Sequence, residues 1–135
     1  MTEEKKDFFV SDISLSYQYT AGNATTRFLN KVAEGKLVAQ KCPKCSAVYV
    51  PPRGSCPRCG VATEEELELP DTGAVESFTI VHIPIPGNPI VPPYVSAMIR
   101  LDGADISFLH LIQEIDLADI RIGMRVQAVW KDKSD

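Results

Sequence analysis

The chain has 135 residues, of which 44% are hydrophobic and 24% are charged, and this composition is typical of a folded globular protein. Its length predicts one domain or two very small ones. The formal net charge of −4 at pH 7 argues against a general affinity for phosphate backbones. No run of about 18 apolar residues is present, so we expect no transmembrane helix. Acids among residues 1–7 are unlike a signal peptide, so we expect a cytoplasmic protein with reduced thiols.

The N-terminal part predicts an arm followed by one short helix. We expect residues 1–24 to form the arm, because the first 20 residues show neither helical nor strand periodicity. Thr25 or Thr26 is predicted to cap an amphipathic helix with Phe28 and Val32 on its apolar side. Gly35 follows the last turn, where the backbone turns left-handed. Such a short helix needs a surface to dock on.

Four cysteines form two pairs with the spacing C-x2-C-x10-C-x2-C: Cys42, Cys45, Cys56 and Cys59. Two residues between cysteines allow both thiolates of one turn to point at a common ion, so the set predicts a closed structural Zn²⁺ site. An iron site of the rubredoxin type uses the same ligands and stays open. A thioredoxin-type redox pair needs a βαβ setting, which is absent, and disulfides need an oxidising compartment.

Short strands are predicted on both sides of the first cysteine pair, at residues 37–40 and 47–50. From residue 74 onward the pattern is that of β-structure, with strands expected at 74–83, 94–101, 104–112 and 124–131. Asp102-Gly103 is a tight-turn signal, and residues 116–119 allow one helical turn. These strands with one short helical turn predict a small barrel.

Charge is unevenly distributed along the chain. Residues 41–60 carry four bases and no acid, whereas residues 61–71 carry five acids and no base. Three of the bases, Lys44, Arg53 and Arg58, lie within or between the cysteine pairs. This basic lobe is expected either to meet phosphates or an acidic partner, or only to offset the charge of the thiolates.

The sequence predicts no catalytic residue. His82 and His110 are the two side chains suited to acid–base chemistry at neutral pH, and each shares a predicted strand face with apolar residues. We therefore interpret them as core residues. The carboxylates of residues 64–68 are expected to be solvated rather than a matched catalytic pair. No Ser-His-Asp order, phosphate-binding glycine loop or zinc-protease motif is present.

Five of the ten prolines lie in residues 83–93, between two predicted strands. An apolar segment with few backbone donors is poorly solvated, so it either folds over its own barrel or binds a partner or an apolar ligand. Fixed φ angles lower the cost of ordering the segment on binding, which favours a partner or ligand.

Several ordered motifs resemble a known family of acyl-CoA-associated proteins, long labelled a domain of unknown function. Its members join an N-terminal helix and a rubredoxin-like zinc ribbon to a C-terminal OB-fold. The motifs that carry the resemblance are residues 28–35, 41–45, 51–53, 56–60, 73–79, 93–94, 101–103 and 121–126. The resemblance implies a mainly β fold, with a helix plus zinc ribbon at residues 25–70 and an OB-fold domain at residues 71–135.

The resemblance also implies an accessory role. Members pair with thiolase-like enzymes, lipid-transfer-type aldolases or hydratases, and include the small subunit of benzoylsuccinyl-CoA thiolase. They stabilise the enzyme and help to bind a CoA thioester, while the catalytic residues belong to the partner. On this hypothesis the chain is a non-catalytic subunit of a hetero-oligomer, and Lys44, Arg53 and Arg58 contact CoA phosphates.

The alternative hypothesis is binding of single-stranded nucleic acid, which zinc ribbons and OB-folds both perform elsewhere. Such a groove needs basic residues and aromatic platforms for the bases. Residues 72–135 carry five bases and eight acids, a net −3. Their aromatic residues are better explained as core: Phe78, Tyr94, Phe108 and Trp130. The missing positive charge therefore favours the accessory-subunit hypothesis.

Overall fold

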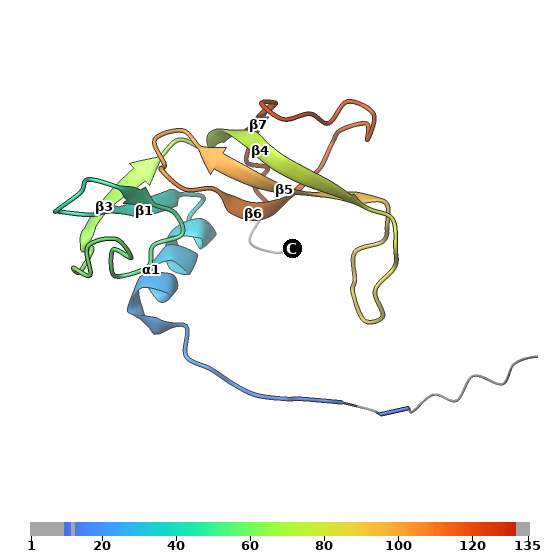
Figure 1. The fold of residues 1–135 in the computed structure, drawn as a ribbon, viewed down its shortest axis with the longest axis horizontal. Coiled ribbons are helices and arrows are strands. Elements are labelled where there is room, and N and C mark those ends of the chain that lie inside the picture. The colour runs from blue at the N-terminus through green and yellow to red at the C-terminus, as the bar shows by residue number, and fades with distance from the viewer. Residues whose placement is uncertain (1–9, 12, 132–135) are drawn as a thin grey trace, which may run out of the picture.

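The computed structural model describes residues 10, 11 and 13–131, and shows a mainly β protein with one helix (Figure 1). The helix and the first three strands precede a second sheet of four strands. In chain order the elements are α1 (Gly22–Ala33), β1 (Leu37–Lys41), β2 (Val48–Tyr49), β3 (Glu65–Leu69), β4 (Thr72–Val81), β5 (Tyr94–Leu101), β6 (Phe108–Ile112) and β7 (Arg125–Gln127).

Helix α1 starts earlier than predicted. Its N-cap residue is Ala21, which makes no side-chain cap, so the expected cap at Thr25 or Thr26 is wrong. Gly22 has φ +79°, which lets the chain turn directly into the helix. Gly35 has φ +76°, which confirms the predicted left-handed C-terminal turn. No residue of the helix is fully buried, although its apolar side packs against the first sheet.

The first sheet is antiparallel with the order β2-β1-β3. Strand β3 was not predicted, because its run of acids indicates solvated loop. In the structure, Leu67 and Leu69 pack towards the core while the three glutamates of the strand remain exposed. Glu68 pairs with Lys36 at 3.1 Å and Glu66 with Arg27 at 3.1 Å. The strand therefore forms by pairing with β1, which the local composition does not reveal.

The second sheet is antiparallel with the order β6-β5-β4-β7. Strand β5 has the predicted boundaries, whereas β7 is shorter than predicted and ends at Gln127. A β-bulge between Val75 and Ser77 shifts the pairing of β4 by one residue. Val75 therefore joins Phe78 and Ile80 in the core, whereas strict alternation along the strand would place it on the face of Ser77.

Some side chains assigned to the core are more exposed than expected. Trp130 follows the end of β7 and is 38% exposed, so its assignment to the core is wrong. Phe78, Tyr94 and Phe108 are each half-buried. The expected helical turn at residues 116–119 is a single turn in which the Asp119 N–H donates to the Asp116 carbonyl at 2.9 Å.

The two sheets meet along a shared seam. Leu101, Ala104 and Phe108 of the second half pack with β1, β2 and β3 of the first half. Asp105 adds a polar link, because its carboxylate accepts the Val48 N–H at 2.7 Å and its N–H donates to the Val48 carbonyl at 3.0 Å. These contacts join the two halves through a common core rather than a linker.

In the described part of the chain, α1 is too short and too polar to span a bilayer.

Candidate metal centre

The four cysteines converge on one point, as the spacing predicted. Their sulfur atoms all lie within 4.8 Å of one another, and no disulfide joins them. The Sγ atoms of Cys45 and Cys56 are 3.7 Å apart. A tetrahedral ion with metal–sulfur bonds of about 2.3 Å needs sulfur–sulfur edges of about 3.8 Å. The cluster therefore has the size of a tetrahedral four-thiolate metal site.

Two knuckles with the same backbone geometry hold the sulfurs. In the first, Ser46 N–H donates to the Cys42 carbonyl at 2.9 Å; in the second, Gly60 N–H donates to the Cys56 carbonyl at 2.9 Å. Ser46 and Gly60 have φ values of 61° and 66°, so both knuckles close on a left-handed residue. Small residues at these two positions fit that requirement.

Backbone N–H groups also point at the first sulfur of each knuckle, as the motif predicts. The N–H groups of Lys44 and Cys45 lie 3.4 Å from the Cys42 sulfur. In the second knuckle the N–H groups of Cys59 and Arg58 stabilise the Cys56 thiolate. Cys42 and Cys56 are buried, so these donors replace water around the sulfurs that the solvent does not reach.

The Tyr49 hydroxyl lies 3.3 Å from the Cys56 sulfur. This hydrogen bond lowers the pKa of Cys56 to about 6, which favours the thiolate, the form that binds a metal. Without a metal, burial raises the pKa of Cys59 to about 12, so its thiolate becomes stable only when a cation neutralises it. The donor set therefore fits a bound divalent metal.

Gln40 is a supporting residue that the sequence analysis did not single out. It is fully buried, and its Oε1 accepts the Gly54 N–H at 2.9 Å and the Thr63 hydroxyl at 3.1 Å. These bonds fix the loop that precedes the second cysteine pair. The available signal was an amide side chain that directly follows the apolar run Leu37–Ala39.

The three cations assigned to CoA phosphates lie on the surface of this ribbon. Lys44 belongs to the first knuckle, Arg58 to the second, and Arg53 to the loop between them. All three are exposed, and within residues 10, 11 and 13–131 none forms an ion pair. By contrast, Arg27 and Lys36 at the other side of the ribbon are paired with acids of β3.

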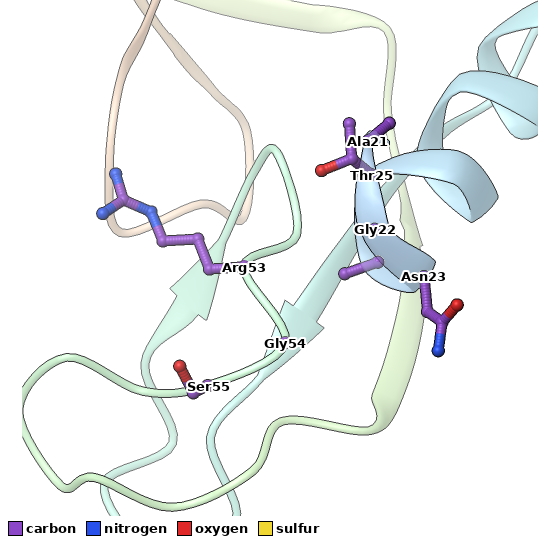
Figure 2. Close-up of a pocket in the computed structure, with 8 residues that line it drawn as sticks. Ala21, Gly22, Asn23, Thr25, Arg53, Gly54 and Ser55 are labelled. Carbon is purple, nitrogen blue, oxygen red and sulfur yellow. The ribbon is translucent and has the colours of Figure 1, made fainter. Parts of the chain in front are cut away.

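A cavity of about 420 Å³ lies beside the ribbon, between the first turn of α1 and the loop of Arg53 (Figure 2). The helix contributes residues 21–25 and the loop contributes residues 53–55. Figure 2 shows the guanidinium of Arg53 extending away from the helix. The cavity is open to solvent and contains no histidine or carboxylate.

Neither histidine is a core residue, and this corrects the interpretation of the sequence. His82 follows β4 and is exposed, because it lies where the chain leaves the sheet. His110 lies on β6, the last strand of its sheet, and is also exposed. The two residues are on separate elements, and neither faces the cavity beside α1.

Comparison with known proteins relates both halves of the chain to one family. Residues 30–65 match the family model described as "ChsH2, rubredoxin-like zinc ribbon domain", and residues 66–131 match "ChsH2, C-terminal OB-fold domain". A "DUF35 domain-containing scaffold protein" of Methanocaldococcus jannaschii is 37% identical over 97 residues, which cover 70% of this chain and 67% of that protein. The chain belongs to the DUF35 family of ChsH2-type proteins.

Other members of the family agree in sequence and structure. A "Probable enoyl-CoA hydratase alpha subunit" of Thermomonospora curvata is 34% identical over 95 residues, which are 70% of this chain. The match spans only 29% of that longer protein. A DUF35 protein of unknown function from Sulfolobus solfataricus has a TM-score of 0.62 at 29% identity, covering 76% of this chain and 72% of that chain.

The structure titled "Ltp2-ChsH2(DUF35) aldolase" has a TM-score of 0.67 at 29% identity and covers 79% of this chain and 83% of that chain. Together these matches confirm the expected fold of the DUF35 protein, a zinc ribbon followed by an OB-fold domain. The four-cysteine cluster is the metal site of its ribbon.

Proposed function

We propose that this DUF35 protein is a non-catalytic accessory subunit of a thiolase-type acyl-CoA enzyme complex. Relatives named as a scaffold protein, an enoyl-CoA hydratase subunit and an aldolase complex support this proposal. We propose that Zn²⁺ occupies the ribbon site and serves the fold. Four thiolates complete its tetrahedral shell, so no coordination position remains for a substrate.

The loop between β4 and β5 carries the proposal. Ile83 is 76% exposed, Ile85 58% and Val91 82%, and the loop projects from the end of the second sheet (Figure 1). The loop therefore does not fold over its own barrel, which was one of the two expectations from the sequence. A proline-restricted apolar loop that is open to solvent fits a docking segment for an enzyme subunit.

A matched pair of variants tests the docking loop. Ile83→Asp is expected to raise the dissociation constant of the complex with a thiolase-like enzyme subunit by at least about tenfold, because a charge would be buried in the interface. Ile122→Asp is the control, since Ile122 is 69% exposed and lies outside the loop. If both variants bound the enzyme subunit equally well, the loop would not be part of the interface. A chain that binds no thiolase-like subunit and no CoA ester would overturn the proposed function.

We further propose that Lys44, Arg53 and Arg58 contact the phosphates of a CoA thioester in the assembled complex. Their exposure and lack of ion pairs within the described residues support this role. Replacing all three by glutamine is expected to raise the dissociation constant for a CoA ester, measured by calorimetry on the complex. Lys31→Gln is the control, because Lys31 is already paired with Glu34 at 2.8 Å. An unchanged affinity of the triple variant for the CoA ester would show that these three side chains do not contact it.

A further inference from the structure

The N-terminal arm contains a strand pattern that the sequence analysis overlooked. Apolar and polar residues alternate strictly through residues 13–20, whose sequence is Ile-Ser-Leu-Ser-Tyr-Gln-Tyr-Thr. The apolar members are Ile13, Leu15, Tyr17 and Tyr19, and none of the eight residues is charged. A period of two places all four apolar side chains on one face of an extended chain.

In the structure this segment is extended, and it pairs with no strand among the described residues. Figure 1 shows it leaving the first turn of α1 and running clear of both sheets. Ile13 is 92% exposed, Leu15 80% and Tyr19 81%, and the rings of Tyr17 and Tyr19 lie 6.3 Å apart. Four exposed apolar side chains on one strand face are unfavourable in water, and a surface that covers them would stabilise the segment.

Strand β6 offers such a surface. It is the last strand of the second sheet, and its outer edge pairs with no other strand among the described residues. Leu109 and Leu111 lie on the face of this edge that they share with Ser96 and Met98. Leu109 is 65% exposed, and a shallow cavity of about 280 Å³ is lined by Ser96, Leu109, His110 and Leu111.

The other sheet edges suit the arm less well. Strand β2 has two residues and β7 has three, which is too short for an eight-residue strand to pair stably. Strand β3 has five residues, but three of them are glutamates that would lie beside an apolar face. Strand β6 has five residues, its outward face carries no acidic or basic side chain, and an open cavity adjoins it.

We propose that residues 13–20 of one copy pair with the open edge of β6 in a second copy, and that two copies exchange their arms reciprocally. The apolar face of the arm then covers Leu109 and Leu111, and a tyrosine of the arm enters the adjoining cavity. The serines of the arm then face the other side of the sheet. Main-chain hydrogen bonds hold the arm against β6. Contact between the apolar face of the arm and the two leucines, Leu109 and Leu111, sets the register of the pairing.

The test uses the purified full-length chain and measures its mass by sedimentation over roughly 1–200 µM, the range in which a micromolar dimer dissociates. The native chain is expected to dimerise. The double variant Leu15→Asp/Tyr17→Asp is expected to raise the dimer dissociation constant by at least about a hundredfold, because it places two charges against β6. Ser14→Asp/Ser16→Asp adds the same charge to the opposite face and is expected to remain dimeric.

A mixing experiment identifies the receptor. Leu109→Asp is expected to abolish the dimer without unfolding the chain, because Leu109 is largely exposed. The Leu15→Asp/Tyr17→Asp chain keeps an intact β6 edge, and the Leu109→Asp chain keeps an intact arm. An equal mixture of the two monomeric variants is therefore expected to form a heterodimer with one complete arm–edge contact, which neither variant forms alone.

The remaining outcomes would overturn the proposal. A native chain that stays monomeric, with its arm protected from hydrogen exchange, would mean that the arm folds onto its own copy. A monomer whose arm becomes protected only with an enzyme subunit present would assign the arm to that partner. A dimer that all variants preserve would place the interface elsewhere. The test needs no enzyme subunit, so its result is independent of the proposed function.

Discussion

The zinc ribbon and the OB-fold domain are each built on one antiparallel sheet, but they close their cores in different ways. The OB-fold sheet has strands of ten, eight, five and three residues and buries its own cluster around Val75, Val95 and Ile99. The ribbon has strands of five, two and five residues, and its cluster includes Leu101 from the other half. The ribbon is too small to bury a sufficient core of its own, so its fold also depends on a metal site and on apolar side chains of the OB-fold domain that pack against it.

The two halves also differ on their surfaces. The ribbon exposes the cations Lys44, Arg53 and Arg58, which form no ion pair with any other residue that the structure describes. The OB-fold domain instead exposes apolar groups at the β4–β5 loop and at Leu109. Charged surface suits a phosphate-bearing ligand, and apolar surface suits a protein partner. The proposed roles therefore divide between the halves, with the ligand on the ribbon and the partners on the OB-fold domain.

The largest expected effect comes from removing the metal. Cys56→Ser is expected to abolish binding of one Zn²⁺ per chain and to unfold the ribbon, because structural zinc contributes on the order of 10 kcal/mol in zinc-finger peptides. Zinc analysis and hydrogen exchange over residues 37–69 measure the effect. Ser55→Ala, one residue away, is the control and is expected to keep the metal. Full ribbon protection in the Cys56→Ser variant would contradict the view that the ribbon depends on its metal.

A smaller effect is expected from the shared seam. Leu101→Ala is expected to lower the free energy of unfolding by about 2–5 kcal/mol and also to weaken zinc binding, because Leu101 is buried against the ribbon strands. Val95→Ala removes buried volume from the OB-fold cluster alone. It is expected to cost about 1–3 kcal/mol without changing zinc affinity. Equal effects of both variants on zinc affinity would show that the seam does not couple the halves.

The smallest effect is expected at the surface of the OB-fold domain. Asp102 accepts hydrogen bonds from Arg125 and Thr72, and these hold the pKa of its carboxyl well below the usual 3.8. A carboxyl whose pKa is lower in the folded chain than in the unfolded chain stabilises the fold. This stabilisation is complete at pH values above the unfolded-state pKa and is lost as the pH falls through the folded-state pKa. Asp102→Asn is therefore expected to lower Tm near neutral pH. The decrease is expected to be only a few degrees, because the side chains of Asp102 and Arg125 are partly exposed and water screens their charges.

The pH dependence separates this interaction from a general loss of stability. The difference in Tm between the native chain and Asp102→Asn is expected to be constant near neutral pH and to shrink below about pH 4. Asp119→Asn is the control, because the Asp119 side chain forms no ion pair within residues 10, 11 and 13–131. A difference that grows as the pH falls would contradict the assignment.

The metal site and the positions of several strands along the chain follow from local sequence. The spacing of the cysteines is enough to predict the cluster, because each knuckle is a short turn whose geometry depends on its own residues. Gly35 marks the end of α1, and the alternation in Tyr94–Leu101 gives the boundaries of β5. In each case the signal and the structure lie within a few residues of each other.

The features that sequence analysis missed depend on distant partners. Strand β3 forms because β1 pairs with it, and the bulge after Val75 reverses which residues of β4 face the core. His82 and Trp130 lie just beyond strand ends, so a periodic pattern that places them in the core no longer applies. These properties arise from pairing and strand termination, which the neighbours of a residue along the chain do not encode.

The sequence by itself determined the four-cysteine site, because each chelating turn is formed by residues that are adjacent in the sequence. Only the tertiary structure decided that a chain of 135 residues builds two sheets on one shared seam. It also decided that the docking loop and the face of β6 remain in solvent, because burial is set by which elements meet in space.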